Sequence, residues 1–195
     1  AAIDELIGSI LPEDLIFVLA SQSDGKTLLS RQIAKHISLR APVLEIQMEM
    51  SDEQLIARDI STASGIAVGA ISEGRVDAFD FERVEAAAGE IDKLDYYIHD
   101  VPDITVRQIK GVAQSMKRSK GLGFILIDQF DKIRTERHIP NKFDRGTEVT
   151  RDLKSLAKEL KVPIMVLAQR TRMAQRSDGE VPRINDAEFP SIEKD

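Results

Sequence analysis

Apolar residues recur along the chain at two spacings, and these spacings predict strands and helices in alternation. Short apolar runs typical of buried parallel strands occur at Leu15–Leu19, Val43–Met48, Tyr96–His99, Gly123–Asp128 and Pro163–Ala168. Between these runs, apolar residues recur every three or four positions, which is the spacing of amphipathic helices. Strands that alternate with helices predict an α/β fold with a mostly parallel sheet flanked by helices.

The helical stripes also predict which surfaces form the core. Helices are expected at Lys26–Ser38, after Ser51, over Phe81–Ile91, after Thr105 and from about Thr147. The first helix is expected to turn a stripe that includes Leu28 and Leu29 toward the sheet, and the stripe over Phe81–Ile91 is expected to be core. Residues 65–74 are expected to form a glycine-spaced turn, and residues 134–145 an exposed loop.

Composition narrows the class of protein. A length of 195 residues, with 42% hydrophobic and 31% charged residues, is typical of one soluble α/β domain. Without cysteine the chain has no disulfides and no thiolate chemistry, and its three histidines lack metal-ligand spacing. A net charge of -6 argues against wholesale wrapping of nucleic acid but permits a local basic track. No apolar run reaches membrane-spanning length, so a cytoplasmic protein without membrane contact is expected.

The polar turn after the first strand has the spacing of a phosphate-binding loop. Residues 20–27 read ASQSDGKT, which is the Walker A pattern with Ala20 at its first glycine. Backbone N–H groups of such a loop and the positive end of the following helix bind phosphate, and Lys26 reaches the outer phosphates. The Thr27 hydroxyl can ligate Mg²⁺. The alternative is a surface turn that contains Gly-Lys-Thr, which the flanking strand and helix disfavour.

Two carboxylates stand at the ends of later strands. Glu49 follows the second strand and precedes a helix that Ser51 and Gln54 open with capping-box spacing, a good mounting for a catalytic group. Asp128 ends a buried strand in the form of a Walker B element and can support Mg²⁺ through water. The alternative for Asp128 is a cap on the next turn.

Several blocks, in order along the chain, resemble the RecA-like motor domain of DnaB-type replicative helicases. The family patterns ARPSxGKT, SLEMS, RSLKALAKEL, LSQLNR and SIEQD are similar to Ala20–Thr27, Gln47–Ser51, Arg151–Leu160, Leu167–Arg172 and Ser191–Asp195. The resemblance covers nearly all of residues 1–195 as a single domain. It also implies that the later strands of the family are not present, so the domain is expected to be truncated at its C-terminal end.

The resemblance implies ATP hydrolysis coupled to translocation on single-stranded DNA during replication, with ATP and Mg²⁺ as ligands. Catalysis would rest on Glu49, which would position or deprotonate the attacking water, on Lys26, and on Gln169, which would sense the γ-phosphate. Thr27 and Asp128 would hold Mg²⁺. The nucleotide would contact Ser21, Gln22, Ser23, Asp24, Gly25, Lys26, Thr27, Leu28 and Arg58, and DNA would contact Arg170, Arg172 and Arg183. The alternatives are an ion pair on a helix surface for Arg58 and solvated surface charges for the three other arginines. A ring hexamer that meets a primase or helicase loader is implied as the assembly.

Departures from the family pattern keep other functions open. Gln22 replaces the proline of the loop, and Asp24 adds a carboxylate, which is expected to face outward because a phosphate would repel it. These differences indicate a divergent branch, such as one carried by a phage or plasmid. The isolated fragment is expected to hydrolyse ATP slowly. It is also expected to be able to exist as a monomer. The alternatives are a RecA-like recombination or repair ATPase and a nucleotide-binding scaffold with little turnover.

Overall fold

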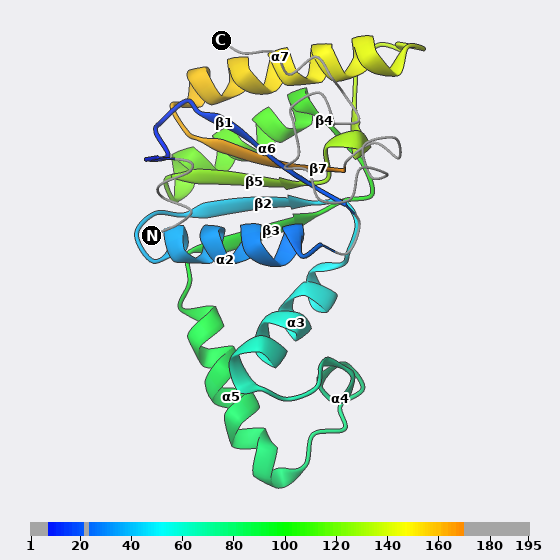
Figure 1. The fold of residues 1–195 in the computed structure, drawn as a ribbon. Coiled ribbons are helices and arrows are strands. Elements are labelled where there is room, and N and C mark those ends of the chain that lie inside the picture. Colours follow the sequence, from blue (N-terminus) through cyan, green and yellow to red (C-terminus); the bar gives the residue numbers. More distant parts are fainter. Residues whose placement is uncertain (1–7, 22–23, 170–195) are drawn as a thin grey trace.

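A parallel sheet forms the centre of the computed structural model, which describes residues 8–21 and 24–169 (Figure 1). Its strands are β1 (Leu15–Ala20), β2 (Val43–Gln47), β3 (Tyr96–Asp100), β5 (Phe124–Asp128) and β7 (Ile164–Gln169). They lie in the order β1-β7-β5-β2-β3, and every neighbouring pair is parallel. The predicted α/β fold with a mostly parallel sheet is therefore confirmed.

Helices cover both faces of this sheet (Figure 1). Helix α2 (Lys26–Ser38) packs on one face, where Ala34 meets a cluster that includes Phe124 and Leu126. Helices α6 (Val106–Ser119) and α7 (Lys142–Leu160) pack on the other face, over the larger cluster around Ile125 and Ile127. Thr105 caps α6 through a capping box with Gln108, as its position before the apolar stripe predicted.

The buried side of α2 differs from the predicted one. Leu28 and Leu29 are exposed, and the side that meets the sheet carries small residues such as Ser30 and Ala34. Small side chains let the helix approach closely, and the charged Arg31 is also buried because β2 supplies it with a partner. The prediction that the leucine stripe faces the sheet is therefore wrong at its N-terminal end.

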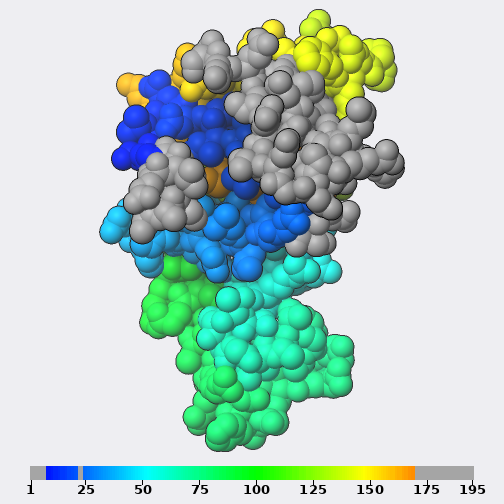
Figure 2. Space-filling model, viewed as in Figure 1, coloured from blue at the N-terminus to red at the C-terminus, as the bar shows by residue number. Residues whose placement is uncertain are grey.

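A helical lobe projects from the sheet, as the cyan and green atoms of Figure 2 show. It consists of α3 (Asp52–Ser64), α4 (Val68–Ser72) and α5 (Ala78–Asp92), and α3 packs against the other two. Helix α4 lies inside the predicted turn. Phe81 is 57% exposed and Phe79 84% exposed, and within α5 only Ala87 is buried. The predicted core stripe of α5 is therefore wrong at Phe81, and the packing of α3 leaves the rest of the stripe, Val84, Ala88 and Ile91, only half-buried.

Between β5 and α7 the chain forms more regular structure than predicted. A short 3₁₀ helix, η1 (Phe130–Lys132), leads into β6 (Ile133–Arg134), which pairs in parallel with β4 (Ile104–Thr105). Helix α7 begins before the predicted Thr147, because the Asn141 side chain accepts the backbone N–H of Phe143 at 2.9 Å. The exposed loop thus shortens to residues 135–141.

Close packing at the entry to β5 gives a prediction about stability. A Cβ atom added to Gly123 would lie 2.4 Å from the Ala41 Cβ, within repulsive distance. Gly123→Ala is expected to lower the free energy of unfolding by about 1–3 kcal/mol, measured by urea denaturation. Ala41→Gly in the same chain should recover part of the loss. Equal losses in the presence and absence of Ala41→Gly would contradict the contact.

Candidate functional site

The polar residues that carry the predicted chemistry gather at the carboxyl edge of the sheet. Side chains alternate along a strand, and Val43, Leu126 and Leu167 face α2. The same alternation places Gln47, Asp128 and Gln169 on the α2 face, each as the last residue of its strand. The carboxyl edge is where open α/β sheets bind ligands.

The phosphate-binding loop ends at Gly25, which is the N-cap of α2. Gly25 has φ 79°, a left-handed conformation that glycine adopts without steric cost, and it provides no side-chain cap. The first N–H groups of α2 are therefore not satisfied by an N-cap side chain and can meet an anion. Lys26 and Thr27 stand at the start of this helix, as predicted, where Lys26 is buried and Thr27 half-buried.

Asp24 adds a carboxylate to this loop without directing it into the protein. The residue is exposed, and its Oδ2 accepts the backbone N–H of Ser21 at 2.9 Å. The carboxylate thus closes the loop on its own backbone. Gln22 and Ser23 lie outside the described residues.

Thr27 and Asp128 form the centre of the site. The Thr27 hydroxyl donates to Asp128 Oδ2 at 2.8 Å, which leaves its oxygen lone pairs free to face a ligand. Asp128 is 1% exposed, and its Oδ1 has no hydrogen-bond partner among the described residues. The unpaired Asp128 oxygen and the neighbouring Thr27 hydroxyl are both hard oxygen ligands. Such ligands fit Mg²⁺.

Electrostatics join Asp128 and Glu49. Burial raises the pKa of the Asp128 carboxyl, and the Thr27 hydrogen bond and the Lys26 charge oppose this rise. Partial burial and the nearby Asp128 carboxylate raise the pKa of Glu49, which Lys26 again opposes. The charge of Lys26 acts on both carboxylates, and the Asp128 carboxylate acts on Glu49, so the three groups interact electrostatically. A glutamate with a raised pKa suits proton transfer.

Glu49 occupies the bend between β2 and α3. The predicted capping box is present, since Ser51 accepts the backbone N–H of Gln54 and the Gln54 side chain accepts that of Ser51. Helix α3 therefore begins just after Glu49, and the side chain lies exposed at the junction.

Gln169 is hydrogen-bonded to Gln129, the residue that follows Asp128, and sequence reasoning missed Gln129. Gln169 Nε2 donates to Gln129 Oε1 at 3.1 Å, and Gln129 Nε2 donates to Asp131 Oδ1 at 2.5 Å. Gln129 is 2% exposed. Its position directly after Asp128, at the end of a buried strand, is the signal that could have identified it.

Arg58 and Leu28 lie near Thr27. All three line one cavity of about 300 Å³ between α2, α3 and α4. This arrangement places the predicted Arg58 on the wall of a cavity that also reaches the first turn of α2. Arg170, Arg172 and Arg183 lie outside the described residues, so the structure gives no position for the predicted DNA contacts.

Comparison with known proteins settles the family. The model of the DnaB-like helicase C terminal domain matches residues 1–195. The chain belongs to this family. It is 32% identical to the replicative DNA helicase DnaC of Bacillus subtilis (strain 168) and 31% identical to the replicative DNA helicase DnaB of Geobacillus stearothermophilus. Each alignment covers 99% of this chain and 43% of the relative, so the chain spans less than half of these helicases.

Solved structures show the same fold. One solved ATPase domain has a TM-score of 0.87 and 25% identity, with 95% of this chain and 67% of that chain covered. A DnaB-like replicative helicase, described with its interactions with primase, has a TM-score of 0.84 and 26% identity, with 91% of this chain and 43% of that chain covered. The RecA-like fold implied by the sequence motifs is thereby confirmed.

This DnaB-like domain also contains a buried ionic cluster that the sequence did not reveal. The Arg31 guanidinium pairs with Glu45 of β2, and with Asp59 of α3 at 2.6 Å. Tyr96 of β3 donates to the Glu45 carboxylate at 2.8 Å. Burial lowers the pKa of the Arg31 guanidinium, but the charges of Glu45 and Asp59 have the larger effect, and the pKa is raised overall. The cluster ties α2 to β2, α3 and β3, and so holds the phosphate-binding helix against the sheet.

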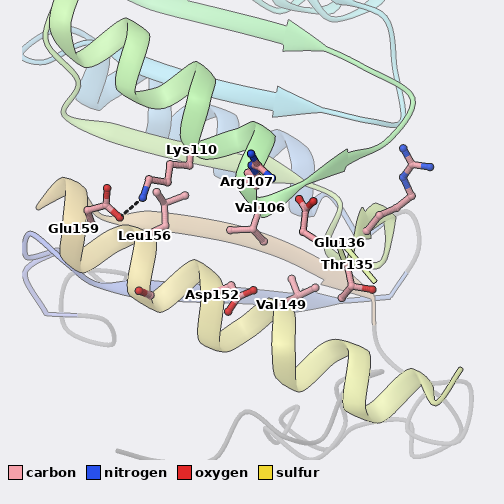
Figure 3. A pocket seen from close by; sticks show the side chains of 11 residues that line it. Val106, Arg107, Lys110, Thr135, Glu136, Val149, Asp152, Leu156 and Glu159 are labelled. Atoms are coloured by element: carbon pink, nitrogen blue, oxygen red, sulfur yellow. Dashed lines mark hydrogen bonds and ion pairs between the residues drawn. The ribbon is translucent and has the colours of Figure 1, made fainter. Parts of the chain in front are cut away.

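A second cavity, of about 220 Å³, lies between α6 and α7 (Figure 3). Val106, Val149 and Leu156 provide its apolar surface, and Lys110 pairs with Glu159 at 2.6 Å on one side. None of the predicted site residues lines it. The candidate site of this DnaB-like domain is therefore at the carboxyl edge of the sheet.

Within residues 8–21 and 24–169, no helix has the length and hydropathy of a membrane span.

Proposed function

We propose that this chain is the motor domain of an ATP-dependent DNA helicase, which couples ATP hydrolysis to translocation on single-stranded DNA during replication. The observation that carries the proposal is the Thr27–Asp128 hydrogen bond beside the helix start at Lys26, within the same field as Glu49. Membership of the DnaB-like helicase family and the replicative helicases among its relatives support it.

In this proposal, the side chains at the carboxyl edge divide the work of phosphoryl transfer. Lys26 neutralises the outer phosphates of ATP, and the loop from Ser21 to Leu28 surrounds the phosphates with N–H groups. Thr27 and Asp128 hold Mg²⁺, which when bound neutralises charge on the β- and γ-phosphates. Arg58 adds a cation from the neighbouring cavity wall.

Glu49 and Gln169 act on the reacting end of the nucleotide. Glu49 orients the attacking water and accepts its proton, a role that its raised pKa suits. Gln169 senses the γ-phosphate, and its bond to Gln129 links that response to the strand end that carries Asp128. The DNA path includes Arg170, Arg172 and Arg183.

The assembly proposed for the longer protein is a ring hexamer on single-stranded DNA in the cytoplasm. A structural neighbour is described with its interactions with primase. We extend to this chain a contact with a primase or a helicase loader. A neighbouring subunit completes each ATP site, and the isolated chain therefore hydrolyses ATP slowly.

ATP turnover with and without single-stranded DNA tests the proposal. We expect the assembled protein to hydrolyse Mg²⁺-ATP faster when a poly(dT) strand is present. Lys26→Ala should weaken ATP binding by at least about tenfold, because one cation–phosphate contact is lost. Equal ATP turnover with and without the poly(dT) strand would contradict the coupling of hydrolysis to DNA. Filaments that do not unwind duplex would favour a recombination or repair ATPase, and ATP binding without turnover would favour a scaffold.

A further inference from the structure

We infer that Gln47 is a positioning residue that directs Glu49, through hydrogen bonds to the backbone of the bend. The inference rests on the proposed role of Glu49 in ATP hydrolysis. Gln47 is the last residue of β2 and is fully buried. No sequence signal marked it, because a glutamine in the QMEMS block reads as one residue of an alternating strand.

The contact is specific. Gln47 Oε1 accepts the backbone N–H of Met48 at 2.9 Å and that of Glu49 at 2.8 Å. The Met48 N–H also reaches the Asp128 carbonyl at 2.8 Å, so Met48 has a second acceptor. For the Glu49 N–H, the Gln47 amide is the acceptor that the structure provides.

Charges act on the Glu49 side chain, but no hydrogen bond from the described residues holds it. Its carboxylate makes no hydrogen bond or ion pair with any residue in the described part of the chain. The backbone of Glu49 is the point from which this side chain extends, and Gln47 holds that point from within the sheet.

The Gln47 amide is itself oriented from the phosphate-binding helix. Its Nε2 lies 3.4 Å from Glu45 Oε1, and Glu45 accepts from Arg31 of α2 and from Tyr96 of β3. A line of polar contacts thus runs from α2 through Glu45 and Gln47 to the Glu49 N–H. It connects the helix that starts at Lys26 with the residue proposed to act on water.

Two substitutions separate positioning from packing. Gln47→Met fills the same volume but removes the acceptor. Gln47→Ser leaves a cavity, but a hydroxyl at this position can accept an N–H two residues later. A packing role makes Gln47→Ser the more damaging change, whereas a positioning role makes Gln47→Met the more damaging one for turnover.

The first measurement is hydrogen exchange of the Glu49 amide by NMR, with global stability measured in parallel. We expect Gln47→Met to speed exchange at this amide by at least about tenfold, while amides of β5 keep their protection. Gln47→Ser should retain protection at Glu49. Unchanged exchange in Gln47→Met would overturn the inference, whatever the turnover.

The second measurement is single-turnover ATP hydrolysis. Gln47→Met should lower the rate at saturating ATP by about 10–100-fold, the cost of misplacing a reacting group. Gln47→Ser should stay near the parent rate although it is less stable. Rates that follow stability in the two variants would overturn the inference. Hydrolysis that survives Glu49→Gln would instead contradict the proposed function and leave the exchange result to decide the contact.

Discussion

Glu49→Gln is expected to lower ATP turnover by about a hundredfold to ten-thousandfold, while ATP binding is nearly unchanged. The glutamine keeps the size of the side chain and can still contact a water, but it cannot accept a proton. ATP binding survives because Lys26 and Thr27 make the expected phosphate and metal contacts. Steady-state hydrolysis and equilibrium binding of a fluorescent ATP analogue measure the two effects.

The matched control is Glu53→Gln in the first turn of α3. Glu53 is exposed, and its substitution removes the same charge a short distance from the site, so it reproduces the electrostatic change without the proposed chemistry. We expect its turnover to equal that of the parent. Similar losses in both variants would mean that charge alone is responsible, and undiminished turnover in Glu49→Gln would remove Glu49 from catalysis.

Arg31→Met is expected to lower the free energy of unfolding by about 3–5 kcal/mol, because it leaves the buried Glu45 carboxylate without its cation. Asp59 keeps Lys35 as a partner. Combining Arg31→Met with Glu45→Met should recover most of the loss, since apolar residues of similar volume replace the pair. Urea denaturation measures each variant, with the exposed Lys93–Glu90 pair as the control, where Lys93→Met should have little effect.

The loss in Arg31→Met should also depend on pH. Burial already raises the pKa of Glu45 in the folded protein, and removal of Arg31 raises it further. A carboxyl whose pKa is higher when folded binds more protons in the folded state, so stability falls as the pH rises above the unfolded value of 4.5. The deficit relative to the parent should therefore be smaller at pH 5 than at pH 8. A deficit independent of pH would place its cause in packing.

Local signals predicted much of the site from sequence. The Gly-Lys-Thr turn, the capping box after Glu49 and the polar ends of the strands are set by residues close together in the chain, and the structure has each of them where the pattern predicts. The parallel sheet follows from alternation of strands and helices. Whether these residues bind ATP stays a prediction.

The rest depended on partners that lie far apart in sequence. A helical period shows that Phe81 and Val84 share a face of α5, but not whether another layer covers that face, and none of the described residues buries it fully. Likewise, the sequence alone predicts that Arg31 is a surface cation, because it does not show that Glu45 of β2 is its ion-pair partner. Gln47 and Gln129 matter through contacts with a strand end, which spacing alone does not describe.

The ionic cluster around Arg31 has a consequence for the divergence of this family. A chain that loses Arg31 but keeps Glu45 carries a buried charge without a counterion, and the reverse loss leaves a buried guanidinium short of a carboxylate. Selection against these single changes should make positions 31 and 45 vary together. Relatives with an apolar residue at one position are therefore expected to have an apolar residue at the other.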